Sequence, residues 1–163
     1  MRTYVKGIDE AITALNREVQ KIEGRTLRGL IRGAVIIRRK IDTVPPVVPV
    51  DLGNLRASWF SVTTNSVQAG KSPEFKGPKA TEFAAHHSAV VNEMQGKVKG
   101  KIAVAMGFSA NYAAEVHEKI EAKFRRPGAG AKFFQAAINN SIDEVLEIFF
   151  NEGIHTHVTM VAS

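Results

Sequence analysis

The sequence contains no cysteine among its 163 residues. Disulfide bonds and thiolate metal sites are therefore excluded, and with them most zinc-structural and thiol redox functions. Long apolar runs are missing too: none approaches the roughly 20 residues that a membrane-spanning helix needs, and the N-terminus carries no signal-peptide core. We therefore expect a protein without a membrane segment, made in the cytoplasm.

The composition is that of a globular protein, with 44% hydrophobic residues and a mean hydropathy of −0.09. We interpret residues 1–163 as a single domain, since this length is enough to bury a core. The net charge of +6 is concentrated in residues 1–40, where ten Lys or Arg face four acids, whereas residues 41–163 hold twelve of each sign. The charge surplus thus belongs to the first predicted element.

That element is a long helix over residues 7–42. Apolar residues recur at spacings of three and four, which is typical of one face of a helix: Ile8, Ile12, Leu15, Val19, Ile22, Leu30, Ala34, Ile37 and Ile41. Gly24 and Gly29 each weaken the middle by about 1 kcal/mol relative to Ala, which indicates a kink or break there.

About 180° from the apolar face lies a second stripe at the same spacing, the basic stripe: Arg17, Lys21, Arg25, Arg28 and Arg32, continued by Arg39. Any amphipathic helix has a charged outer face, so a solvated surface is one interpretation. The alternative follows from the single sign, because acids at i±4 that would neutralise the stripe are nearly absent. Such a stripe favours phosphates or an acidic neighbour as its partner.

Residues 43–56 form a proline-rich connector, because Pro45, Pro46 and Pro49 end the helix and hold the chain extended. Gly53 and Asn54 then permit a tight turn. A half-buried strand is predicted over residues 57–68. It contains the only tryptophan, Trp59, which we assign to core packing or, alternatively, to a subunit interface.

An insertion over residues 70–96 follows, with a Gly/Pro/Lys-rich loop and a helix capped by Thr81 and ending at Gln95. Alternation over residues 97–108 predicts a strand with three lysines on its polar side. Asn111 is expected to cap a short helix, residues 119–132 form a basic loop, and a helix over residues 131–151 carries an acidic outer face. Residues 154–161 alternate as a final strand.

These elements predict an α+β domain: a long N-terminal helix and a C-terminal helix packed on a small, mostly antiparallel sheet, with a loop–helix insertion between two strands. Three strands with one covered face leave edges unprotected, and another subunit commonly completes such edges. We therefore expect an oligomer.

No catalytic site, cofactor or metal site is predicted. The glycine-rich loop at residues 125–132 is no P-loop, because Phe133 rather than Ser or Thr follows Lys132. We interpret it either as a plain connector or as a basic loop that contacts nucleic acid or another subunit. Glu115 and Glu118 share a helical face without a marked pocket. The five histidines provide no set of three nameable ligands: His86, His87, His117, His155 and His157.

Three segments carry a resemblance. Residues 49–58 read Pro-Val-Asp-x-Gly-x-Leu-Arg-x-Ser, residues 107–118 read GFSANYAAEVHE, and Arg-Pro-Gly at 126–128 is followed by Lys-Phe-Phe at 132–134. In this order they resemble the signature of the neck, or tail-completion, proteins of long-tailed bacteriophages. Leu52 departs from it, since the family usually has Thr or Ser there; Asp51 is left to cap the turn. The turn residues that match are Pro49, Asp51, Gly53, Leu55 and Arg56.

The resemblance implies a non-enzymatic virion protein, made in the host cytoplasm, that forms a ring of six or twelve subunits at the head–tail junction. Its partners would be other neck and tail proteins, with double-stranded DNA passing through the lumen. The basic stripe would then face either that DNA or the acidic outer face of a neighbour's last helix, and we favour the second, because an attractive lumen would retain DNA. Further candidate interface residues are Trp59, Tyr112, Arg125, Arg126, Phe133 and Phe134.

Two alternatives stay open. One is sequence-nonspecific nucleic-acid binding through Lys21, Arg25, Arg28 and Arg32 together with the lysine-bearing strand. The other is a small hydrolase, which would need a pocket around Glu115, His117 and Glu118. Whether the tail is contractile, which neck proteins are contacted and what the insertion does are not determined by the sequence.

Overall fold

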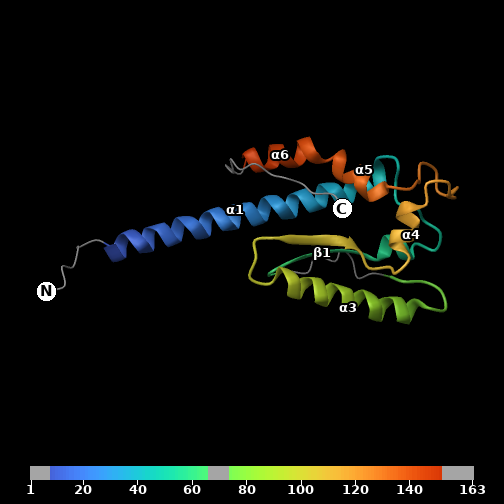
Figure 1. Ribbon diagram of the computed structural model, residues 1–163, viewed down its shortest axis with the longest axis horizontal. Coiled ribbons are helices and arrows are strands. Elements are labelled where there is room, and N and C mark those ends of the chain that lie inside the picture. The colour runs from blue at the N-terminus through green and yellow to red at the C-terminus, as the bar shows by residue number, and fades with distance from the viewer. Residues whose placement is uncertain (1–7, 66–73, 152–163) are drawn as a thin grey trace.

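The computed structural model describes residues 8–65 and 74–151, with side chains described from residue 12 onward. The elements follow one another in the order α1 (Ile8–Thr43), α2 (Asn54–Ala57), β1 (Trp59–Thr63), α3 (Ala80–Val98), β2 (Val104–Phe108), α4 (Ala113–Glu118), α5 (Phe133–Asn139) and α6 (Ile142–Asn151). The predicted α+β class, the long first helix and the helical insertion are confirmed (Figure 1).

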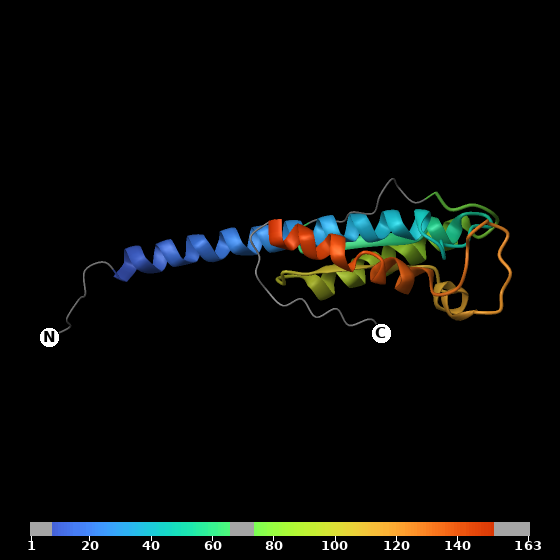
Figure 2. The same ribbon diagram turned by 90° about the horizontal axis from the view of Figure 1, so that it is seen from above.

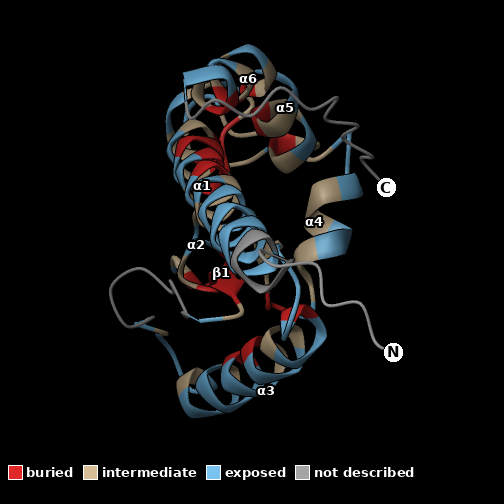
Figure 3. Cartoon of the chain, turned by 90° about the vertical axis from the view of Figure 1, so that its left-hand side faces the viewer, coloured by how far each residue is buried: buried red, intermediate tan, exposed pale blue. Residues whose placement is uncertain are grey.

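The sheet of the described chain is one antiparallel pair, in which Trp59 lies opposite Phe108 and Thr63 opposite Val104. Helices α1, α5 and α6 lie on one side of β1 and α3 lies on the other (Figure 3). All five residues of β1 are buried. The prediction of a half-buried strand was therefore wrong, because the insertion helix covers the face that we expected to be solvated.

Alternating β1 side chains enter two cores. Trp59 points into the larger core, between α1 and α5, whereas Phe60 and Val62 pack against α3. The larger core consists of Ile37, Ile41, Val48, Leu55, Trp59, Ala110, Phe133 and Ala137. The larger core thus joins the end of α1 to segments that lie up to a hundred residues later in the chain.

Helix α1 runs unbroken through both glycines where a kink was expected. A Cβ atom on Gly29 would lie 2.9 Å from the Phe149 ring, and one on Gly33 would lie 3.2 Å from Val145 Cγ1. These glycines therefore allow α6 to approach α1 closely. Val145 and Phe149 are 3% and 5% exposed in this contact.

The predicted strand over residues 97–108 was wrong in its first half. Helix α3 continues to Val98, whose buried side chain joins Phe60 and Val62, and Gly100 then turns the chain with a φ of 73°. Tertiary burial of Val98 overrides the local alternation. The strand begins only at Val104.

The predicted helix over residues 131–151 is divided in two. Buried Ser141 separates α5 from α6, and its hydroxyl donates to the Ala137 carbonyl at 2.6 Å. This break lets α5 pack in the larger core while α6 follows α1. Two predicted caps were also wrong: the residues that precede α3 and α4 are Lys79 and Tyr112, and neither helix start has a side-chain cap. The final strand predicted over residues 154–161 lies outside the described residues.

Candidate functional site

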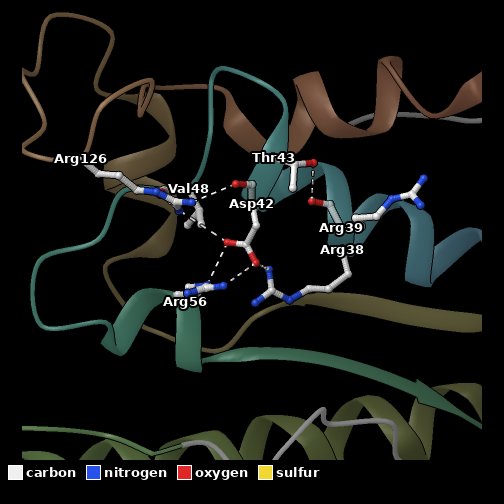
Figure 4. A network of polar contacts seen from close by, with 7 residues as sticks. All are labelled: Arg38, Arg39, Asp42, Thr43, Val48, Arg56 and Arg126. Carbon is white, nitrogen blue, oxygen red and sulfur yellow. Dashed lines mark hydrogen bonds and ion pairs between the residues drawn. The ribbon is translucent and has the colours of Figure 1, made fainter.

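Three arginines converge on the carboxylate of Asp42, near the end of α1 (Figure 4). Arg38 Nη1 lies 2.8 Å from Oδ2, Arg56 Nε lies 2.9 Å from Oδ1, and Arg126 Nη1 lies 3.5 Å from Oδ1. The Asp42 side chain is 17% exposed. We call these four residues the arginine cluster; one carboxylate among three guanidinium groups gives it a formal charge of +2.

The arginine cluster ties three distant segments together. Arg126 also donates to the backbone carbonyls of Val48 and Asp42, both at 2.9 Å. Arg38 lies 5.6 Å above the Trp59 ring, a cation–π distance. Burial lowers the pKa of Arg38, while Asp42 opposes that effect. The geometry is that of a structural clamp, because every guanidinium is engaged within the chain and none is directed at a reacting group.

The predicted turn forms around Gly53, whose φ of 89° lies in the left-handed region. Asn54 secures the turn to the insertion, since its side chain donates to the Lys76 carbonyl at 2.9 Å and accepts from the Lys76 N–H at 2.8 Å. Leu55 is buried in the larger core. Asp51 lies on the surface, with Arg125 Nη1 3.2 Å from its Oδ1.

A pocket of about 360 Å³ opens beside this turn. We call it the turn pocket, and most of its lining is apolar: Pro49, Asp51, Leu52, Gly53, Asn54, Leu55, Phe83, Tyr112, Val116 and Phe124. Burial raises the pKa of Tyr112, and the charge of Asp51 adds to this effect. Two segments of the predicted signature, the turn and residues 107–118, therefore meet in one hollow.

The first half of α1 extends beyond the rest of the described chain (Figures 1 and 2). On this half the predicted apolar face is exposed, whereas from Gly29 onward the same face lies under α6 and in the core. We call the exposed part the apolar stripe. Its members are Ile12, Leu15, Val19 and Ile22, which are 50%, 64%, 43% and 55% exposed.

All five residues of the basic stripe lie on exposed positions of α1: Arg17, Lys21, Arg25, Arg28 and Arg32. Lys21 donates to Glu18 at 2.6 Å, and this bond lowers the pKa of Glu18. Arg28 and Arg32 also have interactions within the chain. The stripe thus begins on the projecting half of α1 and continues to Arg32, where α6 lies against the helix, and it is not a row of uncommitted charges.

The acidic residues predicted on the outer face of the last helix differ in their surroundings. Glu144 is engaged within the chain, with Arg39 Nη2 at 2.8 Å and Lys40 Nζ at 3.0 Å from its two oxygens. The contact with Lys40 is the first cause of a lowered pKa of Glu144. Asp143 and Glu147 are exposed on α6.

The aromatic interface candidates divide between core and surface. Trp59 and Phe133 are 7% and 1% exposed. Phe134 packs edge-on against Trp59 at 5.8 Å between ring centroids. The core assignment of Trp59 is thereby confirmed. Tyr112 instead lines the turn pocket, Arg125 pairs with Asp51 on the surface, and Arg126 lies in the arginine cluster.

The basic glycine-rich loop is partly fixed by the connector. Val47 N–H donates to the Gly128 carbonyl at 2.8 Å, and Gly130 N–H donates to the Val47 carbonyl at 3.3 Å. A Cβ atom on Gly130 would lie 2.9 Å from Pro46 Cβ. Gly130 thus permits close packing of the loop against Pro46. This packing explains why a glycine stands here, and no phosphate-binding role is needed.

The described residues support neither the hydrolase hypothesis nor the metal hypothesis. Glu118 is paired with Lys132 and accepts from His117 at 2.8 Å. None of Glu115, His117 and Glu118 lines the turn pocket. Within residues 8–65 and 74–151, no group of three potential ligands could hold a metal ion. His155 and His157 lie outside the described residues.

Sequence reasoning missed two residues that organise this region. Asp42 is the acid on which the arginine cluster forms; its i, i+4 spacing from Arg38 was the available signal. His87 was given no partner by the sequence, yet it is buried, and its Nδ1 lies 2.7 Å from Ser109 Oγ. The available signal was helical spacing, because His87 lies four residues after Phe83 and three before Val90, whereas its exposed neighbour His86 does not share that face.

Comparison with known proteins gives no match: no family model, no curated protein and no solved structure corresponds to this chain. In the described part of the chain, no helix is long and apolar enough to span a membrane.

Proposed function

We propose that the chain is a structural, non-enzymatic component of a tailed-phage virion, which forms a ring at the head–tail junction through which DNA passes. The resemblance of residues 49–58, 107–118 and 126–134 to the neck-protein signature is the starting point. Their proximity supports treating them as one motif, because Arg56 and Arg126 meet on Asp42 while Tyr112 and Pro49 line one pocket.

The observation that carries the proposal is the projecting half of α1 with its apolar stripe. Four large aliphatic side chains at least 43% exposed on one helix face leave much apolar surface in water. Fully burying such a side chain contributes roughly 1.5–3 kcal/mol, so association is strongly favoured over exposure. A rod that lies outside its own body is suited to contact a neighbour.

The charges on the outer surfaces support assembly from identical chains. Arg17, Lys21 and Arg25 of the basic stripe lie on the projecting half of α1, and Asp143 and Glu147 are exposed on α6. Contact between these two different surfaces is heterologous, as a closed ring requires. Within one chain the same pairing already occurs on a small scale, between Arg39 and Glu144.

The test is the mass of the purified protein by light scattering at low and at high salt. We expect a discrete mass of six or twelve times 17.8 kDa that persists at high salt, because apolar contacts are not screened. A salt-stable monomer would contradict self-assembly. Electron microscopy of the assembled species would then show whether it encloses a lumen.

A second candidate is sequence-nonspecific nucleic-acid binding, favoured by the exposed Arg17, Lys21 and Arg25 on the projecting helix. The lysines that we assigned to a strand lie instead at the end of α3 and in the turn after it. Duplex DNA added in a parallel run distinguishes the two functions. A monomer that binds DNA at low salt and loses affinity steeply with salt would support this candidate over the ring.

A further inference from the structure

We infer that the apolar stripe of one copy docks in the turn pocket of the next copy. This inference rests on the proposed ring, since its partner is a second copy of the same chain, and it identifies the two surfaces that meet. Helix-in-groove recognition works in this way, with side chains at i, i+3 and i+7 acting as anchors in an apolar hollow.

The two surfaces match in size and chemistry. From Ile12 to Ile22 the helix rises about 15 Å, and its members lie within one face. The turn pocket has a volume of about 360 Å³, room for two or three aliphatic side chains, and its lining is mostly apolar. Leu52, 57% exposed at its edge, is itself an exposed apolar side chain.

The charges at the edges are complementary. Glu18 precedes Val19 and Glu23 follows Ile22, so at 100° per residue the two acids border the apolar stripe on opposite sides. The loop over residues 119–126, which supplies Phe124 to the pocket, contains four bases and one acid. Two of these bases, Arg125 and Lys119, are paired with Asp51 and Glu115 at this end. Four bases and three acids leave the rim a net charge of +1. This sign is opposite to that of the acids that edge the stripe, of which Glu18 is also paired with Lys21.

The two surfaces lie at opposite ends of the molecule. The first half of α1 projects at one end, and α4, which contributes Val116 to the pocket, lies at the other (Figure 1). One chain therefore cannot fill its own pocket with its own stripe. Two different surfaces at opposite ends make a heterologous contact, which closes into a ring when the rotation between copies allows it.

Pairing of two apolar stripes with each other is less favourable. Their spacing places Val19 at an a position and Ile22 at a d position, with Glu18 at g and Glu23 at e. In a parallel pair Glu18 would lie opposite Glu23 of the other helix. In the antiparallel register that aligns all four aliphatic residues, the two Glu18 side chains would face each other. Both arrangements bring like charges together.

The absence of native cysteine makes site-specific cross-linking a direct test. We would introduce Val19→Cys and Leu52→Cys together in the full chain and treat this double variant with a short bismaleimide. Docking raises the effective concentration of the two thiols, so we expect a ladder of cross-linked species, with about tenfold more product than in the control. The matched control combines Leu52→Cys with Arg17→Cys, which lies on the opposite face of α1. Light scattering of both variants accompanies the reaction.

The outcomes separate this inference from the proposed function. A ladder that depends on both cysteines supports the docking. A mass of six or twelve chains without the ladder overturns the docking and leaves the ring in place. Efficient dimers from Val19→Cys alone overturn it in favour of stripe-to-stripe pairing. A monomer in solution overturns both the ring and the docking.

Discussion

Asp42 is a carboxylate that neutralises part of a dense group of arginines, so its charge matters more than that of an ordinary surface acid. It lies within 3.5 Å of Arg38, Arg56 and Arg126. Replacing Asp42 with Asn leaves three guanidinium groups near one another without their counter-charge. Removing one partner of a buried ion pair costs roughly 3–5 kcal/mol, and this site is only partly buried.

We therefore expect Asp42→Asn to lower the free energy of unfolding by about 2 kcal/mol. Urea unfolding followed by circular dichroism measures the change. Asp143→Asn is the matched control, because Asp143 is exposed on α6, and its effect should stay within about 0.5 kcal/mol. Equal effects of the two substitutions would show that the arginine cluster contributes nothing to stability.

We expect His87 to make the free energy of unfolding depend on pH. Burial is the first cause of its lowered pKa, opposed by a hydrogen bond with the Ser58 backbone. As the pH falls below about 6.5, the unfolded chain takes up a proton at His87 before the folded chain does. The free energy of unfolding should therefore fall with acidification from about pH 6.5 until the folded pKa is reached.

The measurement is urea unfolding between pH 8 and pH 5, above the range where carboxylates titrate. His87→Gln should flatten the pH dependence, whereas His86→Gln, at an exposed neighbouring position, should keep it. An unchanged slope in the His87 variant would assign the pH dependence to other groups.

Among the elements, the contact between α1 and α6 depends on small residues. A Cβ atom on Gly29 would lie 2.9 Å from the buried Phe149 ring, whereas the nearest atom to one on Gly24 would be Arg28 Nη1, at 3.8 Å. Ala is a better helix former than Gly by about 1 kcal/mol at either position. Steric conflict should reverse this gain at Gly29 alone.

We accordingly expect Gly24→Ala to raise the thermal midpoint and Gly29→Ala to lower it, by several degrees each. Both variants remove one glycine from the same helix, so they share their change in unfolded-state entropy. Thermal melts of the two side by side test the packing. Stabilisation by both would mean that α6 moves aside without cost.

Sequence periodicity predicted the long helices because a sustained 3.6-residue pattern is difficult to mistake. It failed where the chain was locally ambiguous. Val98 fits the alternation of a strand, yet its burial against Phe60 and Val62 keeps it in α3. Ser141 gave no sign of dividing a helix, because a serine hydroxyl can bond the carbonyl four residues back in an unbroken helix as well.

The candidate site was predictable only in part. Gly53 was identified because glycine permits the positive φ that the turn adopts, and Arg56 because it stands in the segment that resembles the neck-protein signature. That Arg56 and Arg126 would share Asp42 could not be foreseen, because the three residues come from segments up to 84 positions apart. The exposure of the apolar stripe was equally hidden: Ile12 and Ile37 look alike in the periodicity, but only Ile37 has a core beside it.

For the whole molecule, the decisive property is that the chain leaves apolar surface at one end and an apolar hollow at the other. If association buries the stripe, an aspartate within it should disrupt assembly without harming the fold. Val19 is 43% exposed in the single chain and lies on the projecting half of α1, so little intrachain packing is lost by changing it. Its replacement by Asp removes an aliphatic anchor and places a charge in the interface.

We expect Val19→Asp to shift the mass in light scattering from the assembled species toward 17.8 kDa, with an unchanged thermal midpoint of the monomer. Loss of one buried anchor, roughly 1.5–3 kcal/mol, weakens each contact by about tenfold to a hundredfold. Gln20→Asp is the control, because it adds the same charge one residue away, outside the apolar stripe. Assembly that survives Val19→Asp but not Gln20→Asp would place the interface on the polar side of α1, where the basic stripe lies.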